Sequence, residues 1–211
     1  GADRAHRGVG EVQRSGHAHP VARGFGRKGR VKHFHFGGGT PNFLSPTQLR
    51  CSVEMLKRHF KFSGAADRDI SIELDPRTVS PQDIAELALA GFNRASLGVQ
   101  DFDPAVQEAV NRIQGIEQTR AVIDACRTHG FRSVNVDLIY GLPKQSLAGF
   151  ARTLETVIAM RPDRLAVYSY AHLPDMFKAQ RQLDATALPD AETKLALLQL
   201  AIETLTAAGY V

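Results

Sequence analysis

The chain has 211 residues, of which 43% are hydrophobic and 23% charged, and its mean hydropathy is −0.20. These values are typical of a soluble protein with one or two packed domains, and they exclude a disordered, collagen-like or coiled-coil chain. Apolar runs stay shorter than the ~18 residues of a membrane helix, no signal-peptide pattern follows Arg4 and Arg7, and there are only two cysteines. The sequence therefore predicts a cytoplasmic protein that does not span a membrane.

The formal net charge of +4 is unevenly distributed along the chain. Residues 1–32 carry eight basic and two acidic residues, whereas the remaining 179 carry 18 basic and 20 acidic ones. Residues 1–30 show neither helical nor strand periodicity, so we predict a disordered basic arm there and a folded domain over residues 31–211. No aromatic interleaving or nucleic-acid-binding motif accompanies the charge, so we expect no nucleic-acid partner.

From Val31 onward, short β-rich runs alternate with amphipathic helices. Strands are predicted at Val31–Phe36, Ile70–Leu74, Arg94–Val99, Ser133–Ile139 and Arg164–Tyr170. Helices are predicted at Pro46–Phe60, from Ser80 to Gly91, in segments between Asp103 and Gly130, at Leu147–Met160 and at Ala191–Ala208.

Five strands, each followed by a helix at intervals of roughly 30 residues, indicate an α/β fold of repeated βα units with a parallel sheet. The strand 133–139 contains Val134, Val136, Leu138 and Ile139, so we expect its two faces to be apolar. Such a chain either closes as a barrel or opens as a doubly wound sheet. Periodicity does not decide between these two folds.

Polar or glycine residues stand at the carboxyl end of every predicted strand. In chain order they are Gly37–Pro41, then Glu73 and Asp75, Gln100 and Asp101, Asp137 and Tyr140, and finally Tyr168, Tyr170, Ala171 and His172. In a βα barrel all these ends lie on one face, where active sites are assembled. We therefore interpret them as a functional rim rather than as unrelated turn formers.

The triple glycine Gly37–Gly39 lets the backbone approach a ligand closely. It matches neither the dinucleotide fingerprint nor the P-loop, which need further glycines or a lysine. Glu73 and Asp137 are candidates to accept hydrogen bonds from ribose hydroxyls or an amino group. Arg112 is a candidate partner of a ligand carboxylate, the alternative being a surface salt bridge.

The histidines and cysteines are interpreted as structural. His33 and His35 share one strand face, a spacing that fits a metal ion, but we favour a packed pair because no third ligand is near. Cys51 and Cys126 fall in predicted helices and are expected to be small core residues. No residue is assigned as catalytic or as a metal ligand.

Five longer runs occur in the chain: HFHFGGGTPNFL, ISIELDPRTV, GFNRASLGVQDFDPAVQEAVNRIQ, SVNVDLIYGLPKQS and DRLAVYSYAHLPDMFKAQR. Together they resemble oxygen-independent coproporphyrinogen III oxidase, a radical S-adenosylmethionine family of haem biosynthesis. The resemblance spans about Val31 to Val211. A sister branch of haem chaperones shares GGGTP and GVQ, whereas AHLPDMFKAQR resembles the oxidase.

The resemblance implies a partial TIM-like barrel of six βα units, of which five are present here and the first strand is missing or altered. It also implies S-adenosylmethionine and a [4Fe-4S] cluster as cofactors, a porphyrinogen substrate, an electron donor and a monomeric protein. The implied activity is the oxidative decarboxylation of coproporphyrinogen III to protoporphyrinogen IX, begun by a 5′-deoxyadenosyl radical. The implied S-adenosylmethionine-binding residues are Gly38, Gly39, Thr40, Glu73, Gln100, Arg112, Asp137 and Ala171.

The family holds its cluster with three cysteines in a Cys-x-x-x-Cys-x-x-Cys run upstream of the glycine turn, and residues 1–30 contain no cysteine. The chain also stops at Tyr210–Val211, where the family continues into a helical domain. We therefore expect a fragment that neither assembles a cluster nor turns over, with an arm translated from a shifted reading frame as one hypothesis. The alternative functions are a haem chaperone of the sister branch and a non-catalytic S-adenosylmethionine-binding module.

Overall fold

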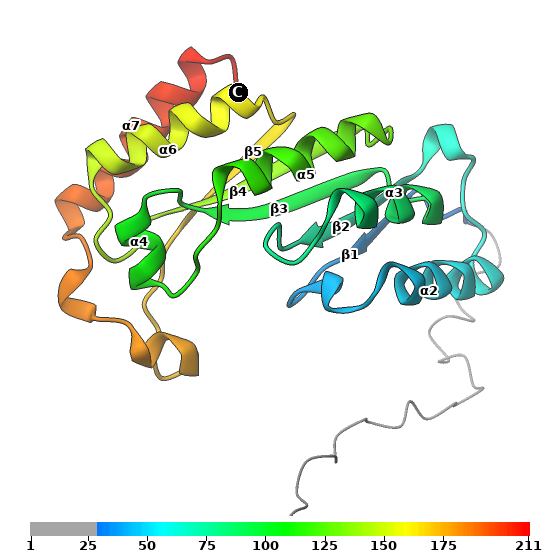
Figure 1. Ribbon diagram of the computed structural model, residues 1–211, viewed down its shortest axis with the longest axis horizontal. Coiled ribbons are helices and arrows are strands. Elements are labelled where there is room, and N and C mark those ends of the chain that lie inside the picture. Colours follow the sequence, from blue (N-terminus) through cyan, green and yellow to red (C-terminus); the bar gives the residue numbers. More distant parts are fainter. Residues whose placement is uncertain (1–28) are drawn as a thin grey trace, which may run out of the picture.

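The computed structural model describes residues 29–211, and the predicted basic arm lies almost entirely outside them (Figure 1). The described residues form one five-stranded parallel sheet with helices along it. Within them, no helix is both long and apolar enough to cross a membrane.

The strands follow one another across the sheet in chain order. They are β1 (His33–Phe36), β2 (Asp69–Leu74), β3 (Arg94–Gln100), β4 (Ser133–Tyr140) and β5 (Arg164–Ser169), and the sheet order is β1-β2-β3-β4-β5. A doubly wound sheet reverses its strand order at a switch point. Because no reversal occurs between β1 and β5, the topology is that of a barrel wall.

The helices begin where the sequence predicts them. They are α2 (Pro46–His59), α3 (Pro81–Ala90), α4 (Pro104–Ala109), α5 (Ile116–Thr128), α6 (Leu147–Met160) and α7 (Ala191–Ala207), with short 3-10 turns η1 (Pro41–Phe43), η2 (Ala65–Asp67), η3 (Lys178–Gln182) and η4 (Ala185–Ala187). The Ser45 side chain accepts from the backbone of Gln48, whose own side chain caps the Ser45 amide, so the capping box predicted for α2 is present.

The two faces of the sheet differ in polarity, so the expectation of two apolar faces is wrong. On β4, Val134, Val136 and Leu138 are fully buried, whereas Asn135 and Asp137 alternate with them and are half-buried. Successive residues of a strand point to opposite faces. The apolar set therefore packs under the helices, and the polar set lines the inner face of the barrel wall.

The hydrophobic core lies between the sheet and the helices, and it contains only one of the two cysteines. Cys126 on α5 is fully buried, as predicted. Cys51 is exposed on α2, so its prediction as a core residue is wrong. The buried residues of α2 are Leu49 and Val53, each two positions from Cys51. Residues two apart do not share a helix face, so Cys51 points away from the core.

Candidate ligand-binding site at the strand ends

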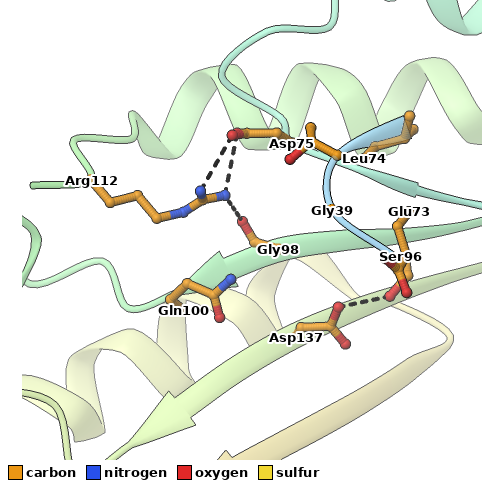
Figure 2. A pocket seen from close by; sticks show the side chains of 10 residues that line it. Gly39, Glu73, Leu74, Asp75, Ser96, Gly98, Gln100, Arg112 and Asp137 are labelled. Carbon is orange, nitrogen blue, oxygen red and sulfur yellow. Dashed lines mark hydrogen bonds and ion pairs between the residues drawn. The ribbon is translucent and has the colours of Figure 1, made fainter. Parts of the chain in front are cut away.

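A cavity of about 180 Å³ opens at the carboxyl ends of β1 to β4 (Figure 2). Because the strands are parallel, their carboxyl ends meet at one edge, and the loops that follow them form the walls. The lining residues are Gly39, Thr40, Glu73, Leu74, Asp75, Ser96, Gly98, Gln100, Arg112 and Asp137. Six of the eight predicted binding residues are among them; Gly38 and Ala171 are not.

The glycine turn after β1 is held against Glu73. The Gly38 amide donates to Glu73 Oε2 at 3.2 Å, and Gly38 and Gly39 have φ angles of 83° and 84°, which favour glycine. At Gly37 a Cβ atom would lie 2.8 Å from Glu73 Oε1 and would also collide with the His35 ring. The turn therefore favours glycine at positions 38 and 39 for conformation, and a side chain at position 37 would require His35 and Glu73 to move.

The two histidines of β1 contact carboxylates at the polar inner face. His35 Nδ1 lies 2.8 Å from Ser71 Oγ, and His35 Nε2 lies 3.2 Å from Glu73 Oε1. His33 Nδ1 lies 3.4 Å from an Asp69 oxygen. Their side chains are 52% and 78% exposed, so the interpretation of a packed pair is wrong. Among residues 29–211, no group of three His, Cys, Asp or Glu residues could hold a metal ion.

Asp137 is a partly desolvated carboxylate opposite the glycine turn. Its Oδ2 accepts from Ser96 Oγ at 2.9 Å (Figure 2). Its Oδ1 accepts from Asn135 Nδ2 at 2.7 Å. Burial raises the pKa of Asp137 above its ordinary value, the two hydrogen bonds oppose that effect, and the charge of Glu73 adds to it. The pocket is thus lined by three carboxylates, Glu73, Asp75 and Asp137, in different environments.

Arg112 forms another part of the wall, through contacts with β2 and β3. Its Nη2 donates to the Gly98 carbonyl at 2.9 Å, and its Nη1 donates to Asp75 Oδ2 at 3.3 Å (Figure 2). Asp75 also pairs with Arg77 at 2.7 Å. Burial would raise the pKa of Asp75, but hydrogen bonds and charge from Arg77, with the charge of Arg112, bring it below its usual value. Arg112 is therefore ion-paired inside the pocket wall rather than on the outer surface.

Ala171 lies apart from this cavity. It follows β5, is exposed, and its carbonyl accepts from Gln180 Nε2 at 3.1 Å. Sequence reasoning missed Ser96 and Gly98 as pocket residues. The signal was available, because both alternate with Gln100 along β3 and so share its strand face.

Three comparisons relate the chain to known proteins. A sequence profile described as the Radical SAM superfamily matches residues 21–157 and so begins inside the predicted arm. The oxygen-independent coproporphyrinogen III oxidase of Pseudomonas aeruginosa is 51% identical over 190 residues, which is 90% of this chain and 41% of that protein. The corresponding protein of Escherichia coli strain K12 is 47% identical over 180 residues, 85% of this chain and 39% of that protein.

The solved structures agree on the fold. The coproporphyrinogen III oxidase of Escherichia coli, described as a radical SAM enzyme, superposes with a TM-score of 0.83 at 46% identity over 86% of this chain and 42% of that one. Methylornithine synthase shares the fold with a TM-score of 0.58 at 13% identity, over 87% of this chain and 51% of that one. These likenesses confirm the predicted TIM-like radical SAM barrel. The chain spans about 40% of the length of the oxidases it matches.

Proposed function

The chain belongs to the radical SAM superfamily, and from this premise we propose that it is the S-adenosylmethionine-binding part of an oxygen-independent coproporphyrinogen III oxidase. In the whole enzyme, each of two propionate side chains of coproporphyrinogen III becomes a vinyl group by losing CO2, a hydrogen atom to a radical derived from S-adenosylmethionine, and one electron to a separate one-electron acceptor. We also propose that the whole enzyme receives electrons from a separate electron donor, is a monomer and is located in the cytoplasm. The observation that carries it is one pocket in which the glycine turn, Glu73, Asp137 and Arg112 meet.

The donors and acceptors of this pocket suit the parts of S-adenosylmethionine. A carboxylate offers about four lone-pair sites. Glu73 uses two of them on His35 and Gly38, so it keeps acceptor capacity for the ammonium group. Asp137 accepts from Ser96 and Asn135 and keeps capacity for ribose hydroxyls.

Arg112 supplies the positive charge that the methionyl carboxylate needs. Its guanidinium carries five N–H donors, of which contacts with Asp75 and the Gly98 carbonyl use only part. Its side chain is 22% exposed, so a carboxylate can still reach it from the cavity. Once bound, S-adenosylmethionine supplies radical chemistry, and the described residues serve to bind and orient it.

The cysteines of this chain do not fit an iron–sulfur cluster. Cluster ligands are thiolates that converge on one site. Cys51 is exposed on α2, whereas Cys126 is fully buried on α5, and burial raises the pKa of Cys126 to about 12. The 211 residues contain no other cysteine. We therefore derive no step through a cluster, and we expect that this chain alone does not turn over.

Calorimetric titration of the chain with S-adenosylmethionine tests the proposal. We expect saturable binding, with affinity reduced at least roughly tenfold, or 1.4 kcal/mol, by Glu73→Gln or by Asp137→Asn. The matched control is Asp124→Asn, which makes the same chemical change on the exposed surface of α5 and should bind like the parent chain.

Two results would contradict the proposal. The first is an absence of binding by the folded parent chain. The second is equal binding by all variants, which would place the ligand elsewhere. Binding of haem without binding of S-adenosylmethionine would favour the haem-chaperone alternative instead.

A further inference from the structure

The residue Gln100, at the end of β3, is held in a strained backbone conformation inside the pocket. Its φ angle is 68°, in the left-handed region that non-glycine residues rarely adopt. The Asp101 amide donates to the Val99 carbonyl at 2.9 Å, which closes a three-residue γ-turn with Gln100 at its centre. The pairing of β3 with β4 is also irregular between Gly98 and Gln100. Such strain persists only where the surroundings enforce it.

The surroundings of the next residue, Asp101, supply that enforcement. Asp101 is 2% exposed, and its carboxylate accepts three hydrogen bonds from three parts of the fold. Thr153 Oγ1 of α6 donates at 2.5 Å, Gln145 Nε2 of the loop after β4 donates at 2.6 Å, and the Asp103 amide at the start of α4 donates at 2.8 Å. Hydrogen bonds to a charged acceptor are stronger than neutral ones, and burial excludes the water that would compete.

A second buried side chain extends this arrangement to Arg112. Gln107 is 6% exposed. Its side-chain Nε2 donates to the backbone carbonyls of Asp101 and Gln114, at 2.9 and 3.0 Å. The backbone amide of Gln114 donates back to Gln107 Oε1 at 3.0 Å, and the backbone amide of Arg112 donates to the backbone carbonyl of Gln107 at 2.8 Å. The loop that carries Arg112 is therefore fastened to the same residue that fixes Gln100.

We propose that Asp101 is a positioning residue: its buried hydrogen bonds to Thr153, Gln145 and Asp103 hold Gln100 in the left-handed turn, so that the Gln100 side chain faces the ligand. This inference rests on the proposed function for the identity of the ligand. Asp101 itself does not line the cavity, whereas Gln100 does (Figure 2). Its role is therefore exerted through Gln100 and not by contact.

The test uses Thr153→Val, which keeps the side-chain shape and removes the hydroxyl that donates to Asp101 and also accepts from the Phe102 amide at 3.1 Å. The control is Tyr210→Phe, which also removes one hydroxyl donor, at 2.9 Å from the Pro162 carbonyl and away from the pocket. We expect Thr153→Val to weaken S-adenosylmethionine binding about tenfold and Tyr210→Phe to change it less than about twofold. In a Gln100→Ala background, Thr153→Val should have no further effect on affinity, because the side chain it positions is absent.

A second readout is independent of any ligand. If Asp101 enforces the left-handed turn, Gln100→Gly should unfold at a higher urea concentration than Gln100→Ala, because glycine adopts positive φ without strain. With Thr153→Val present, this difference in midpoint should shrink.

Three results would overturn the proposal. The first is an affinity for S-adenosylmethionine that Thr153→Val leaves unchanged. The second is a loss of affinity on adding Thr153→Val to Gln100→Ala that equals its loss in the parent chain. The third is an equal urea midpoint for Gln100→Gly and Gln100→Ala. A parent chain that binds no S-adenosylmethionine would refute the proposed function, and the comparison of glycine with alanine would then decide separately whether Asp101 holds the turn.

Discussion

Replacing Gly37 by alanine should disrupt the pocket through a single added methyl group. An added Cβ atom would lie 2.8 Å from Glu73 Oε1 and would overlap the His35 ring. The φ angle of Gly37 is not in the left-handed region, so the substitution adds no backbone strain. The whole effect should come from displacing Glu73 and His35.

The magnitude follows from the contacts that must break. Displacing the Glu73 carboxylate breaks its 3.2 Å contacts with the Gly38 amide and with His35. A hydrogen bond contributes about 0.5–1.5 kcal/mol net, and both partners are partly exposed, so the lower half of that range applies to each. We expect the free energy of unfolding to fall by about 1–2 kcal/mol and the affinity for S-adenosylmethionine to fall at least roughly tenfold.

Urea unfolding followed by circular dichroism and calorimetric titration measure the two effects. The matched control is Gly64→Ala, where an added Cβ atom meets nothing within 4 Å and φ is −55°. That variant should be neutral or more stable by up to about 1 kcal/mol and should bind like the parent chain. If Gly37→Ala behaves like Gly64→Ala, the close approach of Gly37 to Glu73 is refuted.

Three further predictions concern charge, pH and the core. Arg112→Lys keeps the positive charge but loses the planar fork that reaches the Gly98 carbonyl, so calorimetry should show affinity for S-adenosylmethionine reduced about tenfold. Burial raises the pKa of Asp137, so the affinity for S-adenosylmethionine should be present above that pKa and should be lost as the pH falls through it. The loss should occur at a higher pH than for a carboxyl of pKa 3.8. Calorimetric titrations between about pH 7 and 4 should show this step, and Asp137→Asn should lack it. Phe150→Ala, at a fully buried site, should lower the free energy of unfolding by about 3–5 kcal/mol. Leu89→Ala, at an 84% exposed site, should lower it by less than about 0.5 kcal/mol. Equal urea midpoints for the two variants would refute the assignment of the core.

The elements of the fold were predictable because their boundaries carry local signals. The helix α6 lies where its periodicity places it, at Leu147–Met160, and α3 begins after Ser80 and ends before Gly91 as its caps predict. The polarity of the inner face was not predicted, because apolar residues dominate the composition of β4 although Asn135 and Asp137 alternate with them. Successive side chains of a strand point to opposite faces, so the burial of each residue depends on its face and not on the mean composition of the strand.

The part of the candidate site that lies at the carboxyl ends of the strands was predictable from the sequence. The rule that parallel strands deliver their ends to one edge brought Glu73, Gln100 and Asp137 together. It did not bring Ala171 into the cavity. It also gave no sign that Asp101 is anchored by Gln145 and Thr153, 44 and 52 positions away, because such contacts depend on how α6 and the loop before it pack and not on local sequence.

The most direct test of the account is to map S-adenosylmethionine onto the chain by nuclear magnetic resonance. In a titration of the isotope-labelled protein, the backbone amide signals of Gly38, Gly39 and Gln100 should shift together and saturate with a single affinity, while the signal of Gly64 stays in place. Saturable binding that leaves the signals of Gly39, Gln100 and the adjoining Gly38 unmoved, or a folded chain in which no signal moves, would contradict the assignment of this cavity as the S-adenosylmethionine site.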